Sequence, residues 1–309
     1  MPLTPDQIID RKRLKAQLSK WRFVAILAVF GALLYAVGGT KGEGSVMSGG
    51  DYIARITIKD VMYDDVDRDE LIAKIKKDHH AKAVIVRFDT PGGTAIAGEE
   101  VYLQLRDLAH KKPVIAVMRT VCASAGYMAA LGADHLIARE NTLTGSIGVL
   151  MQSVEVSRLA DKLGITPITV KSGEFKDAPS FTSPFTERER EVVSQAVNAS
   201  YKYFVSLIAQ RRNMSMDEVK KLADGRVYTG HQAYELKLID GLGGDPEAKQ
   251  WLTQERKISG SLEVRDIEVE PEFDSILKKL QQLTNIQFFS SLTVPLDGLV
   301  SVWHPSRQF

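Results

Sequence analysis

The sequence predicts an α/β fold with a mainly parallel sheet and flanking helices, and three observations carry that prediction. Two short runs, VIVRF at residues 84–88 and VIAVM at residues 114–118, are rich in β-branched residues, as buried parallel strands are. Between them, residues 97–111 place apolar residues at helical spacing and end before a proline. This alternation of strand and helix is typical of α/β domains.

The remaining elements continue the alternation along the chain. Residues 52–58 alternate between apolar and polar side chains and predict the first strand, and residues 135–138 predict another short one. Thr186 is followed three residues later by Glu189, a capping box that predicts the start of a long helix over residues 186–213. Further helices are predicted over three ranges: 154–163, 216–223 and 231–236.

Composition narrows the functional classes. The 309 residues are 44% hydrophobic, which is enough to bury one or two cores. Forty Lys and Arg residues against 39 Asp and Glu residues give a net charge of +1, so we expect no nucleic-acid partner. The single cysteine, Cys122, excludes an intrachain disulfide and a cysteine-built zinc site. Because the six histidines show no ligand spacing, we expect neither a metal nor a cofactor.

The N-terminal region predicts a membrane anchor. Residues 23–39 contain no charged side chain, and as a helix they would extend about 25 Å, close to the thickness of a bilayer core. Basic residues concentrate in residues 1–22, which the positive-inside rule places in the cytoplasm, with the rest of the chain on the other side. We expect an uncleaved transmembrane anchor; a cleaved signal peptide and a buried core helix are the alternatives.

The segments after the anchor divide by composition. Residues 40–50 are a glycine-rich linker, and residues 51–262 form the main domain. Residues 263–309 are a C-terminal extension whose last part, residues 291–309, is apolar without a clear period. The sequence shows no internal repeat, so we expect one copy of the main domain.

Ser124 lies in a run of small and apolar residues, VCASAGYMAA. Small residues allow backbone and substrate to approach closely, and the helix-like run that follows places Ser124 near a helix N-terminus, where free N–H groups gather. Two interpretations are open at this point: an ordinary helix N-cap or a nucleophile.

Three other loops carry polar or glycine-rich motifs. DTPGGT at residues 89–94 follows a predicted buried strand, and its paired glycines permit a turn whose backbone N–H groups could hold an oxyanion. Ser146 lies in TLTGSIGV, and Lys176 lies in the polar stretch KSGEFKDAPS. The plain alternatives are a strand-to-helix turn, a tight turn and a solvated surface lysine.

Together these stretches resemble the bacterial signal peptide peptidases of the protease IV family, which are membrane-anchored serine proteases with a Ser–Lys dyad. The matching stretches lie between residues 84 and 244: DTPGGT, ASAGYMAALGAD, LTGSIGV, LADKLGI, KSGEFKDAPS and LADGRVYTGHQAYELKLIDGLGG. The resemblance implies a ClpP/crotonase-like fold for residues 51–262. It also implies a serine endopeptidase of the bacterial inner membrane that cleaves apolar peptides such as released signal peptides, with its catalytic domain outside the cytoplasm.

The resemblance also assigns roles to individual residues. It makes Ser124 the nucleophile and Lys176 the general base, with Ser146 orienting Lys176. It places the oxyanion donors at the backbone N–H groups of Gly93 and Ala125; many relatives have glycine at the second position, where alanine still offers an N–H. A free lysine titrates at about 10.4, so the base of such a dyad requires a pKa lowered by several units.

Longer members of the family divide the dyad between two tandem halves, whereas this chain has one Ser124 and one Lys176. We therefore expect a homo-oligomeric ring in which neighbouring protomers share the dyad. Two other function classes stay open: a crotonase-like acyl-CoA enzyme, which the fold alone does not exclude, and a catalytically inactive membrane scaffold.

Overall fold

The computed structural model of the protein describes residues 21–22, 50–268 and 300–302. The chain divides into two units, residues 1–50 and residues 51–309. The predicted anchor over residues 23–39 lies outside the described residues, as does nearly all of the linker. Within the described ranges, no helix is both long enough and apolar enough to span a bilayer.

A nine-stranded, mainly parallel sheet forms the centre of the second unit, with strand order β6-β5-β3-β2-β1-β8 along its main path. Among the described pairs, β5–β6 and β2–β9 are antiparallel and the others are parallel. The sheet confirms the predicted fold class at the level of a mixed α/β architecture. The strands are β1 (Tyr52–Met62), β2 (Ala81–Thr94), β3 (Val114–Ala123), β4 (His135–Ala138), β5 (Leu143–Gly145), β6 (Val227–Thr229), β7 (Gly241–Leu242), β8 (Glu263–Asp266) and β9 (Val300–Val302).

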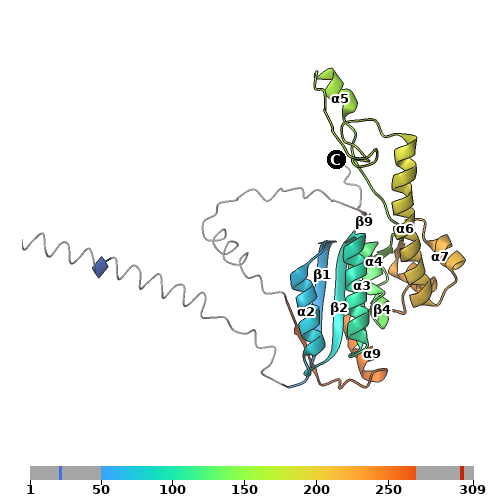
Figure 1. Ribbon diagram of the computed structural model, residues 1–309. Helices are drawn as coiled ribbons and strands as arrows, with labels where there is room; N and C mark the ends of the chain where they lie inside the picture. The colour runs from blue at the N-terminus through green and yellow to red at the C-terminus, as the bar shows by residue number, and fades with distance from the viewer. Residues whose placement is uncertain (1–20, 23–49, 269–299, 303–309) are drawn as a thin grey trace, which may run out of the picture. The chain divides into compact units, whose positions relative to one another are not determined.

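The central strands are covered on both faces. Consecutive residues 83–86 of β2 are fully buried, which requires cover on each side of the sheet and explains the uninterrupted apolar run. Figure 1 shows α2 and α3 against one side of β1 and β2. Ala248 and Leu252 of α9 pack with Ile85 and Ile115 of the sheet. The helices are α2 (Val66–Lys77), α3 (Ala95–Ala109), α4 (Ala125–Ala130), α5 (Ser157–Lys162), α6 (Glu187–Arg212), α7 (Met216–Leu222), α8 (Gly230–Glu235) and α9 (Asp245–Gln254).

Helix α6 begins as the sequence predicts. The hydroxyl of Thr186 accepts from the N–H of Glu189 at 3.2 Å, and the carboxylate of Glu189 accepts from the N–H of Thr186 at 2.7 Å. The capping box is therefore confirmed. By contrast, the helix predicted over residues 154–163 is shorter, since α5 spans Ser157–Lys162 only.

Asp245 at the start of α9 ties that helix to the sheet. Its carboxylate accepts a hydrogen bond from Arg87 Nε of β2 at 3.0 Å and lies 3.8 Å from a guanidinium nitrogen of Arg55 on β1. The hydrogen bond from Arg87, together with the neighbouring arginine charges, lowers the pKa of Asp245 below its ordinary value despite partial burial. A lowered folded-state pKa stabilises the fold above the unfolded-state pKa, and this contribution is lost as the pH falls through the folded-state value.

We expect Asp245→Asn to lower the free energy of unfolding at pH 7 by about 1–3 kcal/mol, because Arg87 loses its charged partner, while Arg55 keeps its ion pair with Asp266. The difference from the unsubstituted protein should shrink below about pH 4, where the carboxylate begins to protonate. Urea denaturation at pH 7 and pH 3 measures both values. An equal difference at the two pH values would show that the charge of Asp245 does not stabilise the fold.

Candidate active site

Ser124 occupies a strained turn between β3 and α4. Its backbone angles, φ 57° and ψ −121°, lie in a region that residues with a side chain rarely adopt. The Ser124 N–H donates to the carbonyl of Gly145 at 2.8 Å, and the Ser124 carbonyl accepts from the N–H of Met128 at 3.0 Å. Such a conformation costs about 1–3 kcal/mol and persists where its surroundings enforce it, often at functional sites.

The structure decides between the two interpretations of the Ser124 hydroxyl as far as capping is concerned. The side chain of Ser124 makes no capping hydrogen bond to α4, so Ser124 does not act as a side-chain N-cap of that helix. A serine on a tight strand-to-helix turn is the arrangement that presents a nucleophile in other hydrolases.

Small residues let α4 approach its neighbours. A Cβ on Gly126 would stand 2.6 Å from the methyl carbon of Thr90, and a Cβ on Gly98 of α3 would stand 2.9 Å from the carbonyl oxygen of Ala125. Both distances are too short for real carbon contacts. The run of alanine and glycine after Ser124 therefore places α4 directly against β2 and α3.

The turn predicted at DTPGGT does not form: β2 continues through Thr94, and Gly92 and Gly93 pair with Val61 and Met62 of β1. This Gly92–Gly93 segment of β2 reaches the same end of the sheet as Ser124. Thr90 of β2 pairs with Cys122 of β3, so two residues further along these parallel strands lie Gly92 and Ser124. Gly92 has a φ of 117°, which favours glycine. A Cβ on Gly93 would stand 1.9 Å from the carbonyl oxygen of Met62, so this position has no room for any side chain.

Ser146 follows the next strand along the sheet. Ala123 pairs with Gly145, and the residues directly after these two are Ser124 and Ser146. Ser146 also has a positive φ, 48°, and its N–H donates to the carbonyl of Arg226 at 2.8 Å. One chain therefore brings Ser124, Ser146 and the Gly92–Gly93 segment to one edge, as expected for the carboxyl ends of parallel strands.

Lys176 lies elsewhere in the chain's structure. It is exposed, in a loop over residues 171–180 that is held by an ion pair between Lys171 and Asp177 at 2.6 Å. Glu174 of the same loop pairs with Arg188 at 3.0 Å, so the loop lies beside the N-terminal end of α6.

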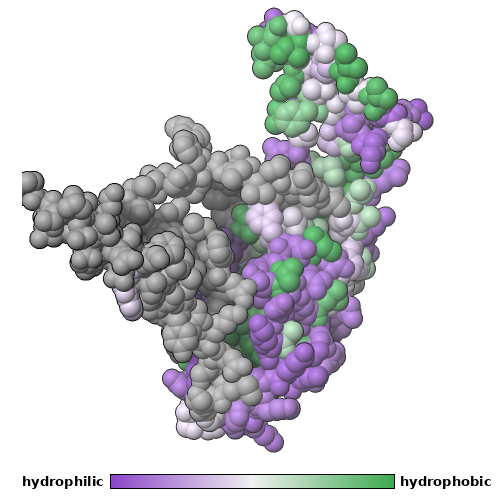
Figure 2. Space-filling view, turned by 60° about the vertical axis from the view of Figure 1, so that its left-hand side comes forward, coloured by the Kyte–Doolittle hydropathy of each residue, from purple (hydrophilic) through white to green (hydrophobic). Residues whose placement is uncertain are grey.

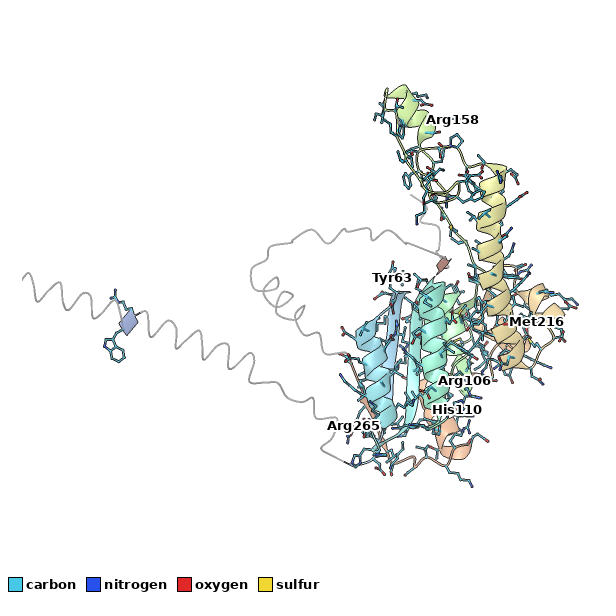
Figure 3. The ribbon with its side chains drawn as sticks, viewed as in Figure 1. Tyr63, Arg106, His110, Arg158, Met216 and Arg265 are labelled. Carbon is cyan, nitrogen blue, oxygen red and sulfur yellow. The ribbon has the colours of Figure 1, made fainter. Side chains whose placement is uncertain are left out.

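The opposite end of α6 packs against α4. Phe204 and Ile208 are buried, and Arg211 Nε donates to the carbonyl of Leu131 at the end of α4, at 2.9 Å. From Arg188 to Arg211 the helix extends about 35 Å. Figure 1 shows α6 leading away from α4 toward α5, and Figure 3 places Arg158 of α5 far from Met216, which follows α6. A single chain does not bring Lys176 to Ser124.

The segment between residues 150 and 185, which we call the arm, carries many exposed apolar side chains. Figure 2 shows hydrophobic residues gathered on it. A groove between the start of the arm and α6 has the apolar lining Leu150, Met151, Val154, Phe185, Val193 and Val197. Other large apolar side chains are more than half exposed on the arm: Leu159, Leu163, Ile165, Ile168, Val170 and Phe181.

Two features near Ser124 were not predicted as site residues. Burial raises the pKa of the Cys122 thiol well above its ordinary value, so Cys122 stays protonated and does not compete as a nucleophile. Thr90 is fully buried, two residues before Gly92 in β2. Its place directly before Pro91 in DTPGGT was the available signal, but a threonine in that place has no specific meaning without its contacts.

Known proteins match the part of the chain that contains Ser124, Ser146 and Lys176. Residues 106–259 match Peptidase family S49. The chain is 40% identical to a putative protease of Synechocystis over 55% of this chain and 61% of that protein. It is 31% identical to a putative protease of Methanocaldococcus jannaschii over 77% of this chain and 81% of that protein. It is 36% identical to a putative signal peptide peptidase of Enterococcus faecium over 61% of this chain and 55% of the relative.

Proposed function

The chain belongs to peptidase family S49, a family of serine-type peptidases, and we propose that it is an endopeptidase whose Ser124 works with Lys176 of a neighbouring copy. The observation that carries this proposal is the strained turn at Ser124. Its hydroxyl makes no capping hydrogen bond to α4, and it shares one sheet edge with Ser146 and the Gly92–Gly93 segment. A backbone conformation this costly is explained by the placement of a reactive hydroxyl.

The proposed reaction uses these groups in sequence. Ser124 Oγ attacks the peptide carbonyl carbon while its proton passes to the neutral amine of Lys176, and the N–H groups of Gly93 and Ala125 stabilise the oxyanion. The protonated lysine then gives its proton to the leaving amine as the carbon–nitrogen bond breaks. Water, deprotonated by the same lysine, hydrolyses the acyl-enzyme and regenerates Ser124. Ser146 accepts a hydrogen bond from the lysine and orients it.

A second copy supplies what one chain lacks. Lys176 is exposed on an arm that α6 holds away from α4, and the same arm displays the exposed apolar residues described above. Exposed apolar surface of this kind marks an interaction site. We propose that the arm packs on the next protomer, so that head-to-tail contacts close a ring and each Lys176 meets the neighbouring Ser124.

The pairing at the edge of β2 beside Ser124 supports the proposal that the substrate is a peptide. Residues 300–302 pair antiparallel with this edge, with Gly92 opposite Val302 and Thr94 opposite Val300. An edge that accepts one extended segment offers the same backbone groups to another, as in recognition by strand addition. We propose extended apolar peptides, such as released signal peptides, as the substrates.

The proposed location is the bacterial inner membrane. Residues 23–39 would form the single-pass anchor in contact with lipid, with residues 1–22 in the cytoplasm and the peptidase domain outside it. Deleting residues 1–40 should release the protein from carbonate-washed membranes. A mature N-terminus near Gly38 or Gly39 would instead identify residues 23–39 as part of a cleaved signal peptide.

The experiment for the activity combines a probe and a cleavage map. A fluorophosphonate should label Ser124, and mass spectrometry should find cleavage within apolar peptides that disappears in Ser124→Ala. Absence of labelling and cleavage in the assembled protein would favour an inactive scaffold. Binding of acyl-CoA without labelling would favour the crotonase-like alternative.

A further inference from the structure

Thr90 is fully buried and contacts three parts of the structure around the candidate site: β1, the Gly92–Gly93 segment and α4. Its hydroxyl donates to the carbonyl of Asp60 on β1. The same hydroxyl accepts from the N–H of Gly92 at 3.1 Å, and the Gly92 carbonyl lies 3.2 Å from it. The methyl carbon of Thr90 faces Gly126 of α4, and a Cβ added to Gly126 would stand only 2.6 Å from it.

The strands on both sides of Thr90 depart from regular pairing. The register between β1 and β2 shifts between Lys59 and Val61, around Asp60, which has a φ of 59°. The register between β2 and β3 shifts between Phe88 and Thr90. Regular ladder hydrogen bonds are interrupted at these shifts, before pairing of β2 with β1 resumes at Gly92, and a buried hydroxyl supplies partners for two of the freed backbone groups.

We propose that Thr90 is a positioning residue for the reaction, which holds the Gly92–Gly93 segment of β2 in place relative to Ser124. This proposal rests on the proposed function, in which the Gly93 N–H binds the oxyanion. The hydroxyl anchors this segment to the β1 bulge, while the methyl group contacts α4, two residues after Ser124. Thr90 itself touches no substrate; it acts through the Gly92–Gly93 segment.

Two substitutions separate the hydroxyl from the methyl group. Thr90→Val keeps the branched shape but leaves the buried Gly92 N–H and the Asp60 carbonyl without the hydroxyl. Thr90→Ser keeps the hydroxyl and removes the methyl group. Because misplacing a catalytic group by about 1 Å can cost about 100-fold, we expect Thr90→Val to lower kcat by about 10- to 100-fold. We expect KM to change by less than about threefold, and Thr90→Ser to stay within about threefold of the unsubstituted enzyme in both constants.

A tetrahedral adduct provides the readout that a purely structural role would not change. Affinity for a peptide boronic acid, which bonds to Ser124 and uses the oxyanion donors, should fall in Thr90→Val in parallel with kcat. Affinity for the matched peptide carboxylate should not change. Rates are taken per titrated active site, so that loss of folded protein does not count as loss of catalysis.

Three results would overturn the proposal: kcat of Thr90→Val within twofold of the unsubstituted enzyme, equal losses in the two variants, or a loss confined to KM. If the unsubstituted protein shows no Ser124-dependent cleavage, that result counts against the proposed function alone. Amide hydrogen exchange then tests whether Thr90 anchors Gly92. Exchange at Gly92 should rise at least about tenfold in Thr90→Val with no change at residues 83–86. Unchanged exchange at Gly92 would refute the anchoring role.

Discussion

Replacing Lys176 with alanine is expected to lower kcat by about 10²–10⁴-fold, because Ser124 then has no group to take its proton. Lys176→Arg should not restore activity, since a guanidinium group stays protonated. The fold should be unaffected, since Lys176 is exposed and the loop is held by other ion pairs.

Lys162 is the matched control, because it is an exposed lysine on α5 of the same arm. Lys162→Ala should retain normal peptide cleavage, and all three variants should keep the unsubstituted melting temperature. Near-normal turnover in Lys176→Ala or Lys176→Arg would exclude the Ser–Lys dyad.

Substituting Gly93 with alanine is expected to lower kcat by about 10²–10³-fold, the effect of removing one oxyanion donor. The new Cβ would stand 1.9 Å from the carbonyl oxygen of Met62, so this part of β2 has to move and the Gly93 N–H leaves its position. Gly260→Ala is the control, because its Cβ would make an ordinary contact of 3.6 Å with Thr253. Steady-state kinetics on titrated sites would contradict this account if Gly93→Ala kept kcat within threefold.

Much of the site's placement was predictable because it depends on parallel topology. Buried apolar runs identified β2 and β3, and Ser124 directly follows β3 as expected. The glycine pair was expected in a turn after β2 but lies within the strand, because its pairing with β1 resumes after the register shift at Asp60. The positive φ of Ser124 was not predictable, because it depends on the carbonyl of Gly145 from a strand about 20 residues away in sequence.

Two helices were missed for local reasons. α2 is so rich in charged residues that few apolar side chains mark its buried side, chiefly Ile72 and Ile75. α9 begins with Asp245 and Pro246 and buries only Ala248 and Leu252. Each helix therefore offers only two apolar residues on its buried side, too few to show the helical spacing that α3 shows.

The position of Lys176 relative to Ser124 was not predictable from the sequence, for a different reason. The capping box predicted where α6 begins, but its direction is set by which part of the helix finds a partner. Phe204 and Ile208 in the C-terminal half are buried, whereas Val192 near the start is exposed. Packing of one half against α4 carries the other half, with the Lys176 loop, away from Ser124.

The central claim is that one active site takes Ser124 from one protomer and Lys176 from the next. Mixing inactive Ser124→Ala protein with inactive Lys176→Ala protein tests it most directly. With equal amounts and random exchange, each junction has one chance in two of an intact Ser124 and one in two of an intact Lys176, so activity should recover to about a quarter of the unsubstituted level. No recovery, in assemblies shown by native mass spectrometry to contain both variants, would place the two residues in a single protomer and contradict the account.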